Sequence, residues 1–542
     1  MQSLKDPEFS NFYQDENQVS YILRNERRRQ ELRRFRHGEA KGRKEYKNLT
    51  LEASGLELIE IFIGNTFWVP SNYKESQLHH IFPLPEKYLY LDFRSCHDIL
   101  FIIFTVLNII YIIMAITMSK LVEKIMTGAM EEKKEILSRK YVDREGLQEF
   151  RDSLQSSLVN IVAGPRRAGK SVFSMLGLDG ADFAYLNFDD DRLRQVSNTD
   201  DIVEGIVSVY GGTKLIFFDE IQNLSGWELF VNKLHRRGYK LVITGSNSKL
   251  LSREMSGALT GRHCLREVFP FSFAEFLKTC SCDYKAGDAM SPEKKGALLN
   301  SLRTYMTFGG FPELSQEPVN AKSYLDALFE STLLKDVVTR YKVRFARQLY
   351  DLAVYLASNV ASEYTFGSLR KNLLFNSTLT VQNYVGFLEE TYLFFSLNRF
   401  SFKFKEQIRS PRKIYMVDNG YVTSCAFRIS PDYGRLLENL VFIELLRRGA
   451  RPNLELFYYR TRTGKEVDFL VRKGLRPDSL IQVCFLTDDS KTMKRELCSL
   501  ADAGDELGCR NLSVITFDTE GDDKIDGKAI KLIPIWKWLL SR

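Results

Sequence analysis

The octapeptide GPRRAGKS spans residues 164–171 and satisfies the pattern G-x4-GK-[ST]. The apolar run LVNIVA, residues 158–163, precedes it directly, and a segment with helical character, residues 172–178, follows it. A strand, a glycine-rich turn and a helix N-terminus in this order can wrap successive backbone N–H groups around a polyphosphate. The octapeptide therefore predicts a phosphate-binding loop at the edge of a parallel α/β sheet.

Two side chains of this loop have expected roles at a bound Mg-ATP. Lys170 is expected to reach the β- and γ-phosphates, and the Ser171 hydroxyl is expected to ligate Mg²⁺. The alternative is a glycine-rich turn that carries a surface lysine. The nucleotide-binding candidates in the loop are Gly164, Pro165, Arg166, Arg167, Ala168, Gly169, Lys170 and Ser171.

Three further apolar runs follow, separated by segments long enough to be helices. They are FAYLNF (183–188), KLIFFD (214–219) and KLVITG (240–245), and each is bounded by Gly, Asp or Asn. Strands that alternate with helices in this way are typical of a parallel sheet with helices on its faces. The fold class predicted for this part of the chain is therefore an α/β P-loop sheet.

The run KLIFFD ends at two adjacent carboxylates, Asp219 and Glu220. A buried parallel strand delivers its last residue to the carboxyl edge of the sheet, where the phosphate loop also lies. We expect Asp219 to enter the Mg²⁺ shell and Glu220 to activate the attacking water. An acidic pair after a strand is often only a helix cap, but its position downstream of the loop favours catalysis.

Three more candidates follow the fourth apolar run. Ser246 and Asn247 could orient the attacking water or contact the γ-phosphate, although a turn rich in Gly, Ser and Asn explains them equally well. Arg262 is a candidate to neutralise charge in the transition state, in its own chain or in a neighbouring subunit. A surface salt bridge is the more common role of a single arginine.

Composition limits the function classes. The length of 542 residues predicts roughly three or four domains, and 44% apolar with 27% charged residues excludes a chain that is disordered throughout. The net charge of +7 is confined to residues 24–47, and the rest has 65 basic and 65 acidic residues. The folded part therefore has no charge excess that favours nucleic acid. Eight cysteines without CxxC spacing predict a reducing compartment and no zinc site.

Residues 1–117 differ from the remainder. A basic arm is followed by an uncharged apolar run at residues 99–117, which is long enough for a membrane span. The alternatives are a buried helix, or a start site placed too far upstream, because Met118 begins a natural helical segment. The flanking lysines would place the C-terminal bulk in the cytoplasm if the span is real.

Several ordered stretches resemble a large, mostly uncharacterised prokaryotic AAA+ ATPase family that is widespread in archaea. The similarity covers residues 118–542. The matching stretches are GPRRAGKS (164–171), LNFDDDRL (186–193), FFDEIQNLSGWE (217–228), ITGSNSKLLSREMSGALTGR (243–262), FPFSFAEFL (269–277), FGGFPE (308–313), LLKDVVTRYKVR (333–344) and YYRTRTGKEVDFLV (458–471).

The resemblance implies an AAA+ ATPase domain at 118–275, a helical region at 276–344 and a winged-helix-like domain at 345–425. A winged helix suggests DNA, but residues 380–393, its second helix, contain no Lys or Arg and carry Glu389 and Glu390. A helix that faces phosphates is expected to be basic. We therefore favour packing against protein for this helix over DNA reading.

The resemblance also implies a restriction-endonuclease-like domain at 426–542. Such a domain uses an upstream Glu, then an Asp, then Glu-x-Lys on the next strand. Glu438 and Asp468 match the first two positions, but Gln482 and Cys484 replace the Glu and the Lys. An amide is a weak Mg²⁺ ligand and a neutral thiol supplies no positive charge, so we expect an inactive nuclease fold.

Together these features predict a cytoplasmic ATP hydrolase that uses ATP and Mg²⁺ to switch C-terminal modules that bind a protein or nucleic-acid partner. Homo-oligomerisation is one expectation from Arg262, and contact with a membrane requires 99–117 to be a real span. The alternative function is an ATP-regulated DNA-binding or nuclease-type protein.

Overall fold

The computed structural model describes residues 96–196, 198–247, 261–280, 284, 291–316, 320–426, 432–485 and 490–541. From Thr105 onward the chain forms one compact unit. The expected basic arm, within residues 1–95, lies outside the described residues.

Helix α4 (Cys96–Ser138) contains the apolar run at 99–117, but most side chains of that run lie outside the described residues. Among the helices searched in the described part of the chain, none combines the length and the apolar character of a membrane span. The C-terminal half of α4 is better defined. Its Val122, Ile125 and Met126 are almost fully buried in the core of the following sheet domain.

The first sheet has five strands in the order β2-β3-β4-β1-β5, and all its pairs are parallel. The strands are β1 (Val159–Ala163), β2 (Ala184–Asn187), β3 (Leu215–Asp219), β4 (Lys240–Gly245) and β5 (His263–Glu267). The four predicted strands and the α/β class are confirmed. Sequence analysis missed β5, because this edge strand is only partly buried and has no apolar run.

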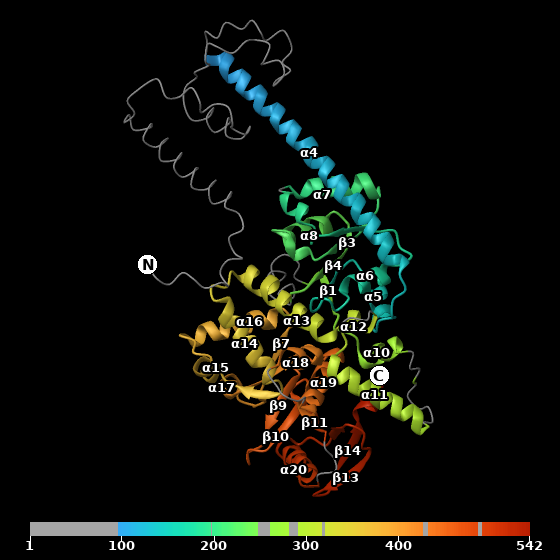
Figure 1. The fold of residues 1–542 in the computed structure, drawn as a ribbon, viewed down its shortest axis with the longest axis vertical. Coiled ribbons are helices and arrows are strands. Elements are labelled where there is room, and N and C mark those ends of the chain that lie inside the picture. The colour runs from blue at the N-terminus through green and yellow to red at the C-terminus, as the bar shows by residue number, and fades with distance from the viewer. Residues whose placement is uncertain are drawn as a thin grey trace, which may run out of the picture. The chain divides into compact units, whose positions relative to one another are not determined.

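Helices pack around this sheet, as Figure 1 shows. They are α5 (Leu147–Ser153), α6 (Lys170–Leu178), α7 (Thr199–Tyr210) and α8 (Trp227–Arg236). Helix α4 packs against α7 at Gly205, where an added Cβ would lie 2.5 Å from Val122 Cγ1. The absence of a side chain at Gly205 therefore permits the two helices to approach closely.

The chain then becomes mainly helical. Helix α10 (Phe273–Thr279) begins with a capping box between Ser272 and Glu275. It is followed by α11 (Pro292–Phe308), α12 (Pro312–Gln316), α13 (Ala321–Ser331) and a π-helical segment (Thr332–Thr339).

Next comes the order helix, strand, two helices and two strands. The elements are α14 (Ala346–Ser358), β6 (Ser362–Tyr364), α15 (Phe366–Asn372), α16 (Thr378–Glu390), β7 (Phe394–Asn398) and β8 (Arg412–Met416). The strands form an antiparallel sheet in the order β6-β8-β7. Between β7 and β8 lies α17 (Phe404–Arg409), and α18 (Asn419–Cys425) follows β8.

The C-terminal part is a six-stranded mixed sheet in the order β13-β14-β12-β11-β10-β9. Its strands are β9 (Leu456–Arg460), β10 (Glu466–Lys473), β11 (Arg476–Cys484), β12 (Leu512–Thr516), β13 (Gly521–Ile525) and β14 (Lys528–Pro534). Its helices are α19 (Tyr433–Arg447), α20 (Ser490–Leu507) and α21 (Ile535–Leu540).

One hydrophobic core crosses the boundaries expected after residue 275. It joins buried side chains of α11, α14, α16 and α19 to those of β8 and α21. At the seam of the two later sheets, Phe400 N donates a hydrogen bond to the Tyr458 carbonyl at 2.7 Å. The helical, middle and C-terminal regions therefore pack together through this core, to which the C-terminal sheet adds a smaller core of its own, whereas the five-stranded sheet has a separate core.

The docking of α4 onto the sheet domain generates a stability prediction. Met126→Ala should lower the free energy of unfolding by about 2–5 kcal/mol, because Met126 is fully buried and its loss leaves a cavity. Lys124→Ala, on the exposed face of the same helix, should change it by less than about 0.5 kcal/mol. Urea titration followed by circular dichroism measures both. Equal effects of the two substitutions would show that α4 does not belong to this core.

Candidate functional site

The phosphate loop at residues 164–171 connects β1 to α6, and two glycines shape it. Gly164 has φ 152°, and a Cβ there would lie 2.0 Å from the Val268 carbonyl oxygen. Gly169 has φ 86° and caps α6. Any larger residue at Gly164 would displace the loop from the chain after β5, so the motif glycine follows from close backbone approach.

The motif lysine is buried at the centre of the loop. Lys170 Nζ donates a hydrogen bond to the Pro165 carbonyl at 3.1 Å and lies 3.4 Å from Glu220 Oε1. The Lys170 side chain is only 3% exposed. This ammonium therefore lies between the loop and the acidic end of β3.

The two acidic residues at the end of β3 are held by Thr244, near the end of the neighbouring strand β4. Thr244 Oγ1 donates to Asp219 Oδ1 and accepts a hydrogen bond from Glu220 N at 2.9 Å. The Ser171 hydroxyl also bonds Asp219. Burial, followed by the charge of Glu220, raises the pKa of Asp219 to about 6. Ser171 and Asp219 together offer the oxygen ligands that suit Mg²⁺.

Glu220 adopts an unusual backbone conformation with φ 49°. Its carboxylate accepts a hydrogen bond from Gln222 Nε2 and lies close to Lys170. Burial alone would raise the pKa of Glu220, but Lys170 and Gln222 lower it below its usual value. Glu220 is therefore held as a carboxylate, the protonation state that a general base requires.

The two polar residues after β4 are buried near this group. Ser246 Oγ accepts a hydrogen bond from Gln222 Nε2 at 3.5 Å. Asn247 Nδ2 donates to the Tyr341 hydroxyl at 3.4 Å, and that hydroxyl donates to Glu390 of α16. The ring of Tyr341 also stacks on Phe387 of α16, with centroids 4.1 Å apart. Asn247 thus connects the edge of the sheet to a helix far along the chain.

The two arginines of the loop bind carboxylates of the helical region. Arg166 forms a bidentate pair with Asp336, with both N–O distances 3.0 Å, and the Asp336 side chain is 5% exposed. This hydrogen-bonded pair raises the pKa of Arg166 further above its usual value. Arg167 lies 3.4 Å from Glu313 and is more exposed. The loop therefore contacts the π-helical segment directly.

Arg262 does not join this site. It is exposed and directly precedes β5, and its carbonyl accepts a hydrogen bond from Val159 N at the start of β1. The phosphate loop follows Ala163, at the opposite end of the same strand. The strand register therefore places Arg262 away from the phosphate loop of its own chain, which corrects the predicted role there. The role in a neighbouring subunit remains a prediction.

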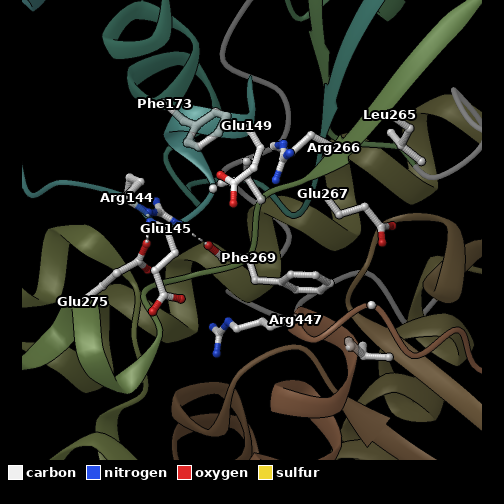
Figure 2. A pocket seen from close by; sticks show the side chains of 14 residues that line it. Arg144, Glu145, Glu149, Phe173, Leu265, Arg266, Glu267, Phe269, Glu275 and Arg447 are labelled. Atoms are coloured by element: carbon white, nitrogen blue, oxygen red, sulfur yellow. Dashed lines mark hydrogen bonds and ion pairs between the residues drawn. The ribbon is translucent and has the colours of Figure 1, made fainter. Parts of the chain in front are cut away.

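A pocket has a volume of about 380 Å³ and is lined in part by the segment before α5 and by β5; Figure 2 shows the side chains that line it. Arg144 lines it and donates to Glu275 at 2.9 Å, to the Phe269 carbonyl at 2.7 Å and to the Ala168 carbonyl at 2.9 Å. Phe173 of α6 and Arg447 from the end of α19 also line the pocket. Arg144 thus connects this pocket to the loop, which itself contributes no lining residue, and Phe173 and Phe269 belong to two different hydrophobic cores.

Three residues of the site region were missed by sequence reasoning. Thr244 was visible only as a strand end, and nothing in its local pattern indicated two hydrogen bonds. Arg144 and Asp336 lie far from the loop in sequence, and only the folded chain brings them to it. Only Asp336 left a signal, a charge within an apolar helical pattern, because a buried charge normally requires a partner.

The carboxylates expected in the C-terminal domain are close together. Glu438 of α19 and Asp468 of β10 both bind the ammonium of Lys413, which comes from β8. Gln482 lies beside Asp468 and accepts a hydrogen bond from its backbone N–H at 3.2 Å. The expectation that no ammonium accompanies these carboxylates was wrong.

Comparisons with known proteins agree with the architecture of the first domain. Residues 156–277 match the family described as AAA domain. Residues 299–433 and 433–538 match two domains of unknown function, DUF8612 and DUF4143.

Two relatives match over most of their length. An uncharacterized protein of Methanocaldococcus jannaschii, MJ1544, is 36% identical over 404 residues, which cover 71% of this chain and 88% of the relative. An uncharacterized protein of Haemophilus influenzae is 29% identical over 427 residues, which cover 75% of this chain and all of that protein.

Among solved structures, a Walker-type ATPase of Pyrococcus abyssi aligns with 14% identity and a TM-score of 0.37, covering 53% of this chain and 96% of that one. AMPPCP-bound DnaA from Aquifex aeolicus aligns with 16% identity and a TM-score of 0.23, covering 46% and 90%.

The buried contacts of Arg144 generate the prediction of this section. Arg144→Met should lower the free energy of unfolding by about 3–5 kcal/mol, because it leaves Glu275 buried without its cation. The matched control is Arg139→Met, since Arg139 pairs with Glu135 and both side chains are more than 60% exposed. The control should be nearly neutral in a denaturant titration. A small effect of Arg144→Met would show that its interactions contribute little to folding.

Proposed function

The chain belongs to the archaeal-type AAA ATPase family of its Methanocaldococcus relative, and on that premise we propose that it binds Mg-ATP and hydrolyses it. The observation that carries the proposal is the convergence of three strand ends. The loop after β1, the carboxylates after β3 and Thr244 at the end of β4 meet at one edge of the parallel sheet. Ligands of open parallel sheets bind at this edge.

We assign the roles as follows. Lys170 and the loop backbone bind the β- and γ-phosphates, and Ser171 and Asp219 supply ligands to Mg²⁺. Mg²⁺ in this position would neutralise the charge that develops on the phosphates. Glu220 accepts a proton from the attacking water, and Thr244 keeps Glu220 and Asp219 in register. Ser246, which lies near Gln222, is assigned the role of orienting the attacking water.

The pocket of Figure 2 suits the nucleoside of ATP. It adjoins the phosphate loop through Arg144, whose Nη1 lies 3.1 Å from the position of a Cβ on Gly169. Glu145 and Arg266 offer polar groups to a nucleoside. Arg447, at the end of α19, also lines the pocket. A bound nucleoside would therefore contact both the sheet domain and the later regions of the chain.

Two substitutions separate binding from hydrolysis. Lys170→Ala should abolish nucleotide binding or turnover, because it removes the buried cation of the loop. Glu220→Gln should retain binding and lower turnover by about 10²–10⁴-fold, the usual contribution of a general base. Fluorescent-nucleotide titration and phosphate release measure the two quantities. Glu204→Gln, on the exposed face of α7, is the control and should leave both unchanged. Turnover of Glu220→Gln at the native rate would refute the assignment of the base.

We further propose that ATP switches the body formed by the later regions. The connections between the phosphate site and that body include the Arg166–Asp336 pair and the path from Asn247 through Tyr341 to Glu390. A γ-phosphate would compete with Asp336 for the guanidinium of Arg166. Binding would then weaken a contact with the π-helical segment, and hydrolysis would restore it.

The partner of the switch is proposed to be a protein. The order of elements from α14 to β8 suits a winged helix, and the acidic C-terminal end of α16 is hydrogen-bonded to other parts of the chain. Glu389 accepts a hydrogen bond from Ser396 N, and Glu390 accepts one from Tyr341. These contacts support packing for α16 and disfavour phosphate binding. ATP turnover that rises several-fold on addition of DNA would instead favour the DNA-binding alternative.

The location and assembly are part of the same proposal. Six cysteines in the part of the chain that the structure describes are free thiols, which suits a reducing cytoplasm where ATP is available; they are Cys264, Cys280, Cys425, Cys484, Cys498 and Cys509. Arg262 is exposed and available to a neighbouring copy of the chain. A homo-oligomer that places Arg262 at the next phosphate site is the assembly that this position favours.

The switch predicts a specific effect of Asp336. Asp336→Asn removes the carboxylate that pairs with Arg166, so ATP should bind about tenfold more tightly, which corresponds to about 1.4 kcal/mol. The change in hydrogen exchange that ATP induces at residues 321–344 of the native chain should disappear. Asp351→Asn breaks an exposed pair with Arg347 and is the matched control. An unchanged exchange response in Asp336→Asn would exclude this coupling.

A further inference from the structure

The ammonium of Lys413 lies at the centre of three carboxylates. Its Nζ is 2.8 Å from Glu438 Oε1, 2.7 Å from Glu466 Oε1 and 2.9 Å from Asp468 Oδ1. The Lys413 side chain is 2% exposed. Burial alone would lower the pKa of Lys413, but the charges of Asp468 and Glu438 raise it well above its ordinary value. Lys413 is therefore a fixed cation.

Protein donors also bond to the second oxygens of Asp468 and Glu466. Asp468 Oδ2 accepts a hydrogen bond from Val483 N at 3.0 Å, and Glu466 Oε2 accepts one from Arg460 at 2.9 Å. Glu438 Oε1 accepts a second bond, from the Tyr415 hydroxyl, at 2.8 Å. Protein donors thus bond to both oxygens of Asp468 and Glu466 and to Oε1 of Glu438, which are oxygens that a divalent ion would require.

On β11, Gln482 and Cys484 replace the Glu and the Lys of Glu-x-Lys, and neither makes the carboxylate cluster available to a metal ion. Gln482 Nε2 donates to Glu496 at 2.7 Å, while its Oε1 accepts from Asp468 N. Cys484 is 4% exposed and belongs to the apolar core of the C-terminal sheet. The amide therefore joins the local hydrogen-bond network, and the thiol contributes to apolar packing.

A cleft of about 840 Å³ leads to the carboxylate cluster. It is lined by Glu438, Glu466, Asp468 and Gln482. Solvent ions therefore have a route to the cluster. An ammonium at this position carries one positive charge where a hard divalent cation would sit among the same oxygens. The two cations cannot both occupy the space between these carboxylates, because each needs the same oxygens at contact distance.

We propose that Lys413 is an internal counter-ion that takes the position of a divalent metal in the C-terminal carboxylate cluster. The native chain consequently binds no divalent ion there and cleaves no phosphodiester at this cleft. Removal of the ammonium converts the cluster into a site for a hard divalent ion with carboxylate ligands. The cation comes from β8 of the middle sheet, so the same contact also joins that sheet to the C-terminal one.

The test uses Mn²⁺ as the probe, with the full chain and without nucleotide. Electron paramagnetic resonance counts bound Mn²⁺ in the native protein, in Lys413→Met and in the double variant Lys413→Met, Asp468→Asn. Lys413→Met should gain one bound Mn²⁺ per chain, and the double variant should lose it. The control is Lys465→Met, which removes another lysine of the cleft that pairs with Asp502 and should gain no ion. A folded Lys413→Met that gains no Mn²⁺ would overturn the proposal.

A second measurement decides the matter if Lys413→Met does not fold. The melting temperature of the native chain is recorded with increasing MnCl₂ and compared with that of Asp468→Asn. The proposal expects the same dependence on Mn²⁺ in both proteins. A Mn²⁺-induced rise in the native chain that Asp468→Asn removes would show that the native cluster already binds metal, and it would overturn the proposal. This result does not depend on ATP hydrolysis, so failure here leaves the ATPase proposal intact.

Discussion

The guanidinium of Arg144 is the interaction on which the arrangement of this chain depends. It joins the Ala168 carbonyl of the phosphate loop, the Phe269 carbonyl after β5 and the Glu275 carboxylate in α10. Ala168 belongs to the sheet domain, Phe269 to the connection that leaves it, and Glu275 to the first helix of the helical region. A planar group with five donors can satisfy such a set, whereas a lysine could not match its geometry. The shape of the loop and the exit of the chain from the sheet are therefore fixed together.

A second theme is the use of buried cations. Lys170, Arg166 and Lys413 each occupy a position among carboxylates that is largely closed to solvent, and the carboxylates come from distant parts of the sequence. Buried pairs of this kind give little net stability, because desolvation offsets the attraction. Their effect is to specify which surfaces meet, since a wrong pairing would leave a charge buried alone. In the phosphate site this specificity is compatible with exchange of partners, because phosphate oxygens can replace a carboxylate.

The sequence was sufficient to predict four strands of the first sheet and to place the central candidate residues at one edge of it. Continuous apolar runs located β1 to β4, and the carboxyl-edge rule brought Lys170, Ser171, Asp219 and Glu220 together before the fold was known. Edge strand β5 has no such run, and without it the position of Arg262 could not be assigned to either end of the sheet. Lys413 escaped notice because a lysine was sought at residue 484, whereas the ammonium comes from a strand of another sheet. Long-range charge pairs leave no local pattern, so only packing reveals them.

The single core that crosses residues 269–539 also has consequences for inheritance. The two regions that match separate families adjoin at residue 433, which is the first residue of α19, and α19 is among the most deeply buried helices of the shared core. A gene break at this point would expose apolar surface on both products. We therefore expect the two regions to occur together in the same gene. A protein that contains only one of them should have polar residues in place of the apolar ones along the face that α19 covers here.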